Sequence, residues 1–568
     1  MKRMLVSVCI ALAGAAVAWA GFRAATPADL PLSGFFPAGP LLYLEAKDFS
    51  SLLNDWNSSP QKKQWVRSDN YEVFSRSRLF LRLQGAGEQF ATAAGIPPDM
   101  NFLSQVAGQR SALAIYDIGK LEFLYVAYLP SAKSAQSSLY QTRSKFEPRN
   151  AGGVDFFVRR DAESERVVAF AISGDYLLLA TREDLLAGAL QLMSGQQGRT
   201  VESASWWTQS TAAAGQAGDL RMVVDLQTIV PNGYFRTYWA QQNITDLSQY
   251  SAAVSDLFRG ANEYREERVL IRKKEPAQPA SVDGLTAAAE LSRLIPDNAG
   301  VYVTAANPGA NSCFALLEMK ILAPHLGPAP ASQIAPQVQL TSGEHGGGSD
   351  LETPIDQAPA EAPATTGSAA ALKDLLARTP ILASLQVETT ERDSAGVFVR
   401  IHSALVLAAA SDWNETGINS ALDQFLRPAL TAGQLGVSWR QKSGYQQLDG
   451  LWPLSVSVRG KDLVVSDDPG LLESILAKVS RKPDQKPFEY SAGFNHKLEG
   501  ENFARLTSLV DRPGMPAASL PASERQPQFF SGNMTSLSST LADVSSERIE
   551  IRSQGDKVKQ TVTYEWSR

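Results

Sequence analysis

Cysteine and histidine are scarce in this 568-residue chain, which contains two cysteines and four histidines. Cys9 lies in an N-terminal apolar stretch, far from Cys313, so no internal disulfide is expected and stability must come from packed cores. Histidine is the usual general base and metal ligand near neutral pH. The histidines are His325, His345, His402 and His496. Their spacing matches no zinc motif, so a metal site is not predicted.

The chain also lacks an excess of positive charge. Lysine and arginine total 53 against 59 aspartates and glutamates, for a net charge of -6. Nucleic-acid binders carry a concentrated basic stripe, so no nucleic-acid partner is expected. Apolar residues make up 44% and charged residues 20% of the chain. This composition excludes a wholly disordered protein and predicts several domains with sizeable cores.

Long hydrophobic runs are missing after the first 22 residues. Residues 4–22 are uncharged and apolar, follow two basic residues, and end near the small residues of Ala18-Trp19-Ala20. Two outcomes are open: residues 1–20 are a cleaved signal peptide, or residues 4–22 remain as an anchor that just spans the hydrocarbon core. Either outcome predicts export to the periplasm or cell envelope. Membrane contact is expected only through this segment, if it is uncleaved.

Sequence signatures of catalysis are also missing. Ser59 and Lys62 resemble the first motif of serine penicillin-binding enzymes, but the spacing of the accompanying motifs does not fit. Gly85-Ala86-Gly87 begins like a dinucleotide-binding loop, but Phe90 occupies the third glycine position. Carboxylates are abundant, although no pair stands out as the acid and base of a hydrolase. We therefore assign no catalytic, cofactor-binding or metal-ligating residue, and we expect no cofactor.

An internal similarity is the strongest signal that the sequence contains. Residues 173–180 and the apolar helix pattern after them reappear without a gap at residues 459–466 and beyond. Each copy reads as a turn at glycine, a short buried strand and a helix with one apolar face. Thr181 predicts a capping box for the first helix, and Asp468 before a proline predicts an N-cap for the second.

The fold class that we predict is α+β, with two tandem related units. Each unit is a largely antiparallel sheet covered by helices, and we expect those helices on one face. The units span residues 33–275 and 290–568, joined by a linker at 276–289. In the first unit, expected strands occupy 41–47, 110–117, 121–129, 153–160, 166–172, 176–180, 219–226 and 264–272. Expected helices lie within 49–57, 61–94, 132–146, 182–194 and 233–258.

Residues 324–370 of the second unit have an unusual composition. They contain no aromatic, lysine or arginine residue and are rich in proline, alanine and glycine. Such a segment buries too little apolar surface to offset its ordering entropy, so we predict a disordered insertion.

The first unit resembles a bacterial family of exported proteins that carry a domain of unknown function. The resemblance rests on a proline-led strand at residues 37–45, the segment 49–53 after it, and the later strand and helix that follow Gly174. It implies a location in the bacterial envelope. The family has no established activity, so the resemblance implies no catalytic residues.

Three functions remain open from the sequence. The first is a non-enzymatic binding or scaffolding protein, because duplicated units with divergent loops suit a binding surface. Its expected partner is an envelope protein or a cell-wall component. The alternatives are a binder of lipid or another apolar ligand and a carboxylate- or serine-based hydrolase. The aromatic residues Trp206, Trp207, Tyr234, Phe235, Tyr238 and Trp239 are expected in cores more than on a binding face.

Overall fold

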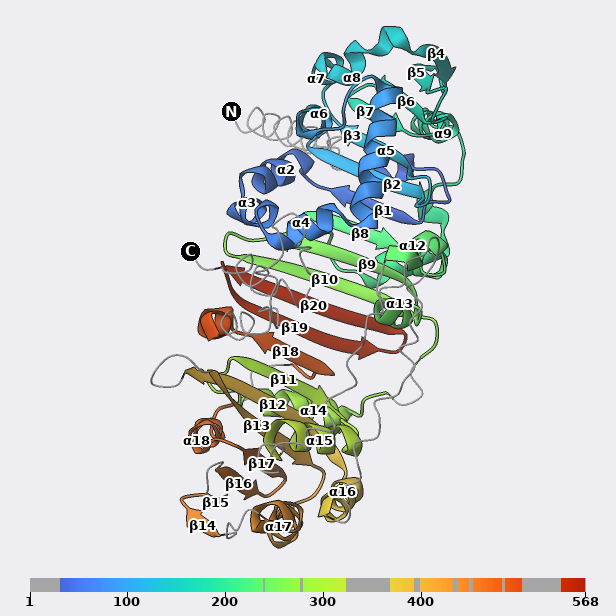
Figure 1. The fold of residues 1–568 in the computed structure, drawn as a ribbon. Helices are drawn as coiled ribbons and strands as arrows, with labels where there is room; N and C mark the ends of the chain where they lie inside the picture. Colours follow the sequence, from blue (N-terminus) through green and yellow to red (C-terminus); the bar gives the residue numbers. More distant parts are fainter. Residues whose placement is uncertain are drawn as a thin grey trace, which may run out of the picture. The chain divides into compact units, whose positions relative to one another are not determined.

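A computed structural model describes residues 31–238, 241–275, 279–322, 368–392, 399–432, 438–448, 453–482, 486–502 and 543–566 (Figure 1). The N-terminal apolar segment predicted to direct export lies outside the described residues. Residues 324–367 of the predicted insertion also lie outside them, whereas residues 368–370 begin a helix. No helix in the described ranges is both long enough and apolar enough to cross a membrane.

The chain forms two compact units and has an α+β fold. Unit 1 comprises residues 1–277, 507–545 and 553–568, and unit 2 comprises residues 278–506 and 546–552. Helix α14 (Val282–Ser292) begins inside the segment predicted as the linker.

Unit 1 is built on an antiparallel sheet. Its strands, in the order in which they pair, are β4 (Glu147–Ala151), β5 (Val154–Arg160), β6 (Val167–Ser173), β7 (Tyr176–Ala180), β3 (Glu122–Tyr128), β2 (Arg110–Asp117), β1 (Leu42–Ala46), β8 (Leu220–Val224), β9 (Tyr250–Arg259), β10 (Glu263–Arg272) and β20 (Lys557–Trp566). The predicted strands of the first unit are all present. Edge strand β4, which contains Pro148, was not predicted, since proline weakens a strand pattern.

Unit 2 is also built on an antiparallel sheet. Its strands pair in the order β14 (Trp439–Lys442), β15 (Tyr445–Leu448), β16 (Leu454–Arg459), β17 (Asp462–Ser466), β13 (Val399–Ala409), β12 (Ile381–Arg392), β11 (Val301–Ala306), β18 (Tyr490–Phe494) and β19 (Val544–Gln554). This order matches the order of unit 1 from β4 to β9, strand for strand. Two strands at the same position in the two sheets also come at the same point in the chain order of their units.

Helices follow the strands in both units. Those of unit 1 are η2 (Leu32–Phe35), α2 (Phe49–Ser58), α3 (Pro60–Val66), α4 (Asp69–Ser75), α5 (Arg78–Ala94), α6 (Met100–Val106), α7 (Ser131–Gln136), α8 (Ser138–Gln141), η3 (Arg143–Lys145), α9 (Glu183–Met193), η4 (Val201–Ser203), α10 (Ser205–Ala213), α11 (Leu226–Ile229), α12 (Gly233–Tyr238) and α13 (Gln241–Leu247). Those of unit 2 are α14, α15 (Ala310–Leu316), the π-helical turn η5 (Leu317–Leu322), α16 (Ser368–Arg378), α17 (Glu415–Ala432) and α18 (Pro469–Leu476).

Helices cover both faces of the sheet in unit 1, not one face as predicted. Along β3, Leu124 and Val126 pack with helices α9 and α10, whereas Tyr125 and Ala127 pack with α5 and α6. Successive side chains of a strand point to opposite faces, so an apolar strand without polar alternation requires cover on both sides. The sequence contains this signal within the expected strand 121–129, because residues 123–129 are a continuous apolar run.

The stretch 61–94 contains helices as predicted. They are three, because Ser59, Ser68 and Ser77 each accept a backbone N–H at the start of a helix. One helix prediction for unit 1 is wrong in part. The segment 233–258 ends in strand β9, which pairs with β8 and β10. The alanines of this segment favour a helix. Pairing with a strand on each side nevertheless stabilises the strand by more than the helix propensity would stabilise a helix.

The two predicted helix caps have different outcomes. Asp468 caps α18 as predicted, with its carboxylate accepting from Leu471 N at 2.6 Å and Pro469 at the first position. Thr181 does not cap α9, which begins after Arg182 without a side-chain cap. The Thr181 hydroxyl instead accepts from Phe123 N at 2.8 Å. The capping box fails because the neighbouring strand occupies that oxygen.

Candidate functional site

A layer of alternating side chains on the unit 1 sheet forms the floor of an apolar cavity. Leu44, Leu113, Tyr125 and Leu179 are directly opposite one another across β1, β2, β3 and β7. Because the side-chain period of a strand is two, this row points to one face while its sequence neighbours point to the other. Four adjacent strands therefore present one continuous apolar row.

Helices α2, α5 and α6 lie over this row, as Figure 1 shows for α5 in front of β1, β2 and β3. Phe49 begins α2 beneath the Asp48 cap and contacts Tyr125 edge-on, with ring centroids 6.5 Å apart. The ring of Phe90 in α5 contacts the ring of Phe102 in α6, with centroids 5.8 Å apart. Aromatic rings thus connect the helical layer to the sheet and hold the two layers around a space.

The space between these layers is a cavity of about 530 Å³. Its lining residues are Leu44, Ala46, Phe49, Ala86, Gly87, Phe90, Pro98, Phe102, Leu103, Val106, Ser111, Ala112, Leu113, Leu121, Phe123, Tyr125, Arg166, Leu179, Thr181 and Leu220. Cavities of about 300–1,000 Å³ with apolar walls and a few polar groups are typical of small-molecule sites.

The polar atoms of the wall are bonded to one another. The Tyr125 hydroxyl lies 2.9 Å from Val106 O and 3.0 Å from Ser111 Oγ, and Gly108 N donates to Ser111 Oγ at 3.2 Å. Burial raises the pKa of Tyr125, so its hydroxyl stays neutral. Since these groups have partners within the wall, they offer little to a polar ligand and leave an apolar lining.

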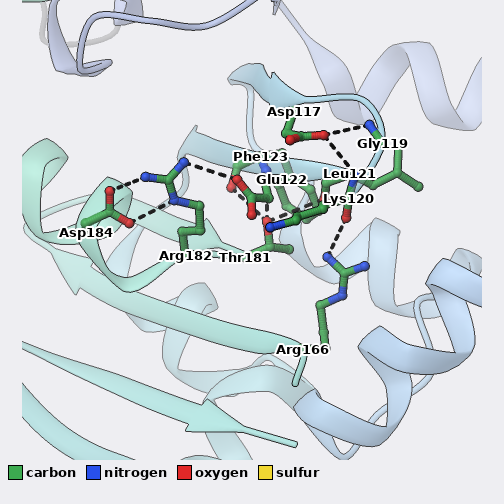
Figure 2. Close-up of polar contacts among 10 residues, drawn as sticks. All are labelled: Asp117, Gly119, Lys120, Leu121, Glu122, Phe123, Arg166, Thr181, Arg182 and Asp184. Carbon is green, nitrogen blue, oxygen red and sulfur yellow. Dashed lines mark hydrogen bonds and ion pairs between the residues drawn. The ribbon is translucent and has the colours of Figure 1, made fainter. Parts of the chain in front are cut away.

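One end of the cavity is bounded by the turn between β2 and β3, at the position where the sequence predicts a turn. Asp117 accepts hydrogen bonds from Gly119 N at 2.7 Å and from Lys120 N at 2.9 Å (Figure 2). Leu121 then adopts a left-handed conformation with a φ of +53°, which is rare for a branched residue. This strained backbone places Leu121 in the cavity wall.

Two arginines hold this turn from other elements. Arg166, which precedes β6, donates to Lys120 O at 2.8 Å (Figure 2) and to Gln89 Oε1 of α5 at 3.0 Å. Arg82 of α5 donates to Gly119 O at 2.5 Å. Arg166 is the one charged residue among those lining the large cavity. Burial lowers its pKa, and the nearby Arg82 lowers it further while Glu122 opposes the shift.

The two described histidines each lie near a carboxylate, and neither lines the cavity. His402 lies 3.1 Å from Glu391 and 3.9 Å from Asp468, and His496 lies 3.7 Å from Glu547. His325 and His345 lie outside the described residues. Across the ranges that the structure describes, no three or more histidine, cysteine or acidic side chains are grouped so as to hold a metal ion.

The serine and lysine that resemble a penicillin-binding motif have structural roles. Ser59 caps α3 by accepting from Lys62 N at 3.1 Å, and its hydroxyl donates to Trp56 O at 2.8 Å. The Lys62 ammonium donates to Asn57 Oδ1 at 2.6 Å instead of approaching Ser59. This arrangement activates no nucleophile.

The other residues considered from the sequence lie mainly in cores. Trp207 and Cys313 are buried, and Trp206 packs against the same core as Trp207. Tyr234 is 49% exposed and lies under the Arg82 guanidinium at 5.7 Å from its ring centre. The side chains of Tyr238 and Trp239 lie outside the described residues.

Sequence reasoning missed the cavity, although it had considered one of its segments. Gly85-Ala86-Gly87, weighed as a dinucleotide loop, lies within α5, where Ala86 and Gly87 line the cavity. The available signal was the pair of small residues Ala86 and Gly87 in the middle of a helix that also carries large apolar residues. They leave space between helix and sheet, because a Cβ at Gly87 would have Pro98 Cγ, at 3.7 Å, as its nearest neighbour.

Comparisons with known proteins leave the family open. No protein-family model and no curated protein matches the chain. Among solved structures, crystal form I of TP0453 is 11% identical with a TM-score of 0.24, covering 44% of this chain and 81% of that chain. Crystal form III of TP0453 is 12% identical with a TM-score of 0.24, covering 48% and 89%. This likeness is too weak to establish a shared fold.

Proposed function

We propose that unit 1 binds an apolar ligand, such as the acyl chain of a lipid, in the cavity between its sheet and helices α2, α5 and α6. The observation that carries this proposal is the internal bonding of the wall's polar atoms, seen at Tyr125 and Ser111. A water molecule in such a cavity finds few of the two to four partners it needs. An apolar chain has no hydrogen bonds to lose on entering the cavity, and it gains dispersion contacts with the wall.

The geometry favours this reading over the other two functions left open by the sequence. Scaffolding requires a surface and gives no reason for a cavity of about 530 Å³ inside one unit. Hydrolysis requires titratable groups that converge on a substrate, whereas the cavity wall contributes one arginine and no carboxylate or histidine.

We also infer that the two units arose by duplication of one ancestral unit. The supporting observation is the shared order of strands, in which β1 of unit 1 and β11 of unit 2 lie between equivalent neighbours. The helices that follow them differ. In unit 2, Phe314 of α15 and Leu376 of α16 are buried in a packed core. We propose that ligand binding belongs to unit 1 and that unit 2 has a supporting role.

The location that we propose is the bacterial periplasm or cell envelope. The support is the basic and apolar pattern of residues 1–22. Fractionation of cells that express the full chain tests this proposal, and recovery of the protein in the cytosol contradicts it.

Ligand binding is tested by titrating the delipidated full chain with the uncharged apolar dye N-phenyl-1-naphthylamine. We expect saturable binding at one site and at least a tenfold loss of affinity, about 1.4 kcal/mol, in Gly87→Leu. Leucine at this position fills the cavity and also has a higher helix propensity than glycine, so the variant should fold.

The matched control is Thr92→Leu, which adds the same side chain at an exposed position of α5 that does not line the cavity. Its affinity for the dye should equal that of the unaltered protein. Absence of saturable binding, or equal binding by the Gly87→Leu and Thr92→Leu variants, contradicts the proposal.

A further inference from the structure

A small pocket adjoins the apolar cavity at the β2–β3 turn. Its volume is about 110 Å³. The two spaces share Ala86, Leu121 and Arg166 as lining residues, so they meet at the left-handed Leu121. The full lining of the small pocket is Leu81, Arg82, Gly85, Ala86, Gln89, Lys120, Leu121 and Arg166.

The charge of this small pocket has one sign. Arg82, Lys120 and Arg166 contribute three cations, and no carboxylate is among the lining residues. Both arginines donate to neutral oxygens, namely Gly119 O, Lys120 O and Gln89 Oε1. Within the described part of the chain, none of the three cations has an ion pair with a carboxylate.

A neighbouring arginine shows the contrast. Arg182 lies 3.1 Å from Glu122 and also pairs with Asp184, so its charge is compensated (Figure 2). The negative charge of Glu122 raises the pKa of Arg166, and Oε2 of Glu122 already accepts a hydrogen bond from Arg182. The like charges of Arg82 and Arg166 therefore remain close together without a counterion, an arrangement that an anion would stabilise.

We propose that the ligand of the cavity is a single-chain amphiphile with one anionic headgroup, a carboxylate or a phosphate monoester, and that Arg82, Lys120 and Arg166 receive this headgroup. This inference rests on the proposed function. The chain occupies the apolar cavity, and the headgroup lies where that cavity meets the small pocket. Arginine suits this role because its planar guanidinium binds carboxylate and phosphate oxygens in pairs.

The test compares three ligands that share one chain and differ in headgroup: oleate, oleoyl lysophosphatidate and oleyl alcohol. Their affinities for the full chain are measured by displacement of the apolar dye. We expect the two anionic ligands to bind at least tenfold more tightly than the alcohol. The ratio between oleate and lysophosphatidate then distinguishes a free fatty acid from a phospholipid derivative.

Two variants locate the headgroup. Arg166→Gln should weaken oleate binding about tenfold while leaving oleyl alcohol binding unchanged. Arg166 also holds the turn, so Lys120→Gln provides a second test, because the Lys120 side chain is exposed and makes no described bond. We expect a loss of threefold or more for oleate in that variant. Arg76→Gln is the matched control, since Arg76 is already paired with Glu72 and lines neither space, and it should leave both affinities unchanged.

The outcomes separate the two proposals. If none of the three ligands displaces the dye, the proposed function is wrong. If all three bind equally, or if Lys120→Gln and Arg166→Gln leave oleate binding unchanged, the cavity binds apolar ligands but the headgroup site is wrong. Acetate and inorganic phosphate should not compete at millimolar concentration, because neither supplies the chain.

Discussion

Gly174 of unit 1 and Gly460 of unit 2 occupy the same place in equivalent hairpins. Each is the first residue of a two-residue loop, which joins β6 to β7 at Ser173–Tyr176 and β16 to β17 at Arg459–Asp462. Their φ angles are +55° and +59°. A positive φ at the first loop residue alone is typical of a type II′ turn, whose twist matches that of the strands.

Replacing either glycine should destabilise its unit. For Gly174→Val we expect a loss of about 1–2 kcal/mol in the free energy of unfolding, because an L residue in a left-handed conformation is strained. Space is not the cause, since a Cβ at Gly174 has no atom within 4 Å. Gly215→Ala is the control, because that glycine also has open space but no positive φ. Urea denaturation measures the change, and equal stability of the Gly174 and Gly215 variants would contradict the argument.

The hydroxyl of Tyr125 should matter for stability and not for ligand binding. Tyr125→Phe removes the bonds to Val106 O and Ser111 Oγ while keeping the ring in the cavity wall. We expect unfolding to become easier by about 1–2 kcal/mol, because a buried carbonyl loses its donor. Affinity for the apolar dye should stay within twofold of the unaltered protein. A large loss of affinity would show that the hydroxyl contacts the ligand, contrary to our account of the wall.

Unit 2 should become less stable as the pH rises from about 4 to 6. Burial raises the pKa of Asp467 to about 6, although Ser403 N donates to its carboxylate and His402 lies nearby. In the unfolded chain this carboxyl ionises near pH 4, so the folded state retains a proton across that window and is favoured at its acidic end. The expected loss is about 3 kcal/mol, reached once the pH exceeds the folded pKa.

The variant that tests this assignment is Asp467→Asn, whose amide oxygen can still accept from Ser403 N. Its unfolding free energy should vary less between pH 4 and 6, and it should exceed that of the unaltered protein at pH 7. Asp374→Asn alters an exposed carboxylate on α16 and serves as the control. A pH profile of Asp467→Asn that is identical to the unaltered profile would refute the assignment.

Cys313 should be unreactive in the folded protein. Burial raises the pKa of its thiol to about 11, so almost no thiolate is present at neutral pH. In a Cys9→Ser background, we expect iodoacetamide to modify Cys313 at least a hundredfold more slowly in buffer than in denaturant. Mass spectrometry follows the modification, and rapid labelling of the native protein would show that α15 opens easily.

Local features of the sequence predicted much of the sheet. The glycine turns at residues 174 and 460, the apolar runs beside them and the Asp468 cap all depend on neighbours within one turn or one hairpin. Such signals depend on backbone conformation and side-chain period, and both can be read along the chain.

Other features depend on contacts between residues far apart in the chain. The alanines of β9 form a strand because β8 and β10 pair with it, and Thr181 bonds to Phe123 across the sheet instead of capping α9. The cavity, and the small pocket lined by Arg82, Lys120 and Arg166, also depend on such long-range contacts. They exist because packing places α5 over four strands and brings Arg82 and Arg166, 84 positions apart, to one turn. Local periodicity says that a side chain must be covered, but only packing settles which element covers it and how much space remains.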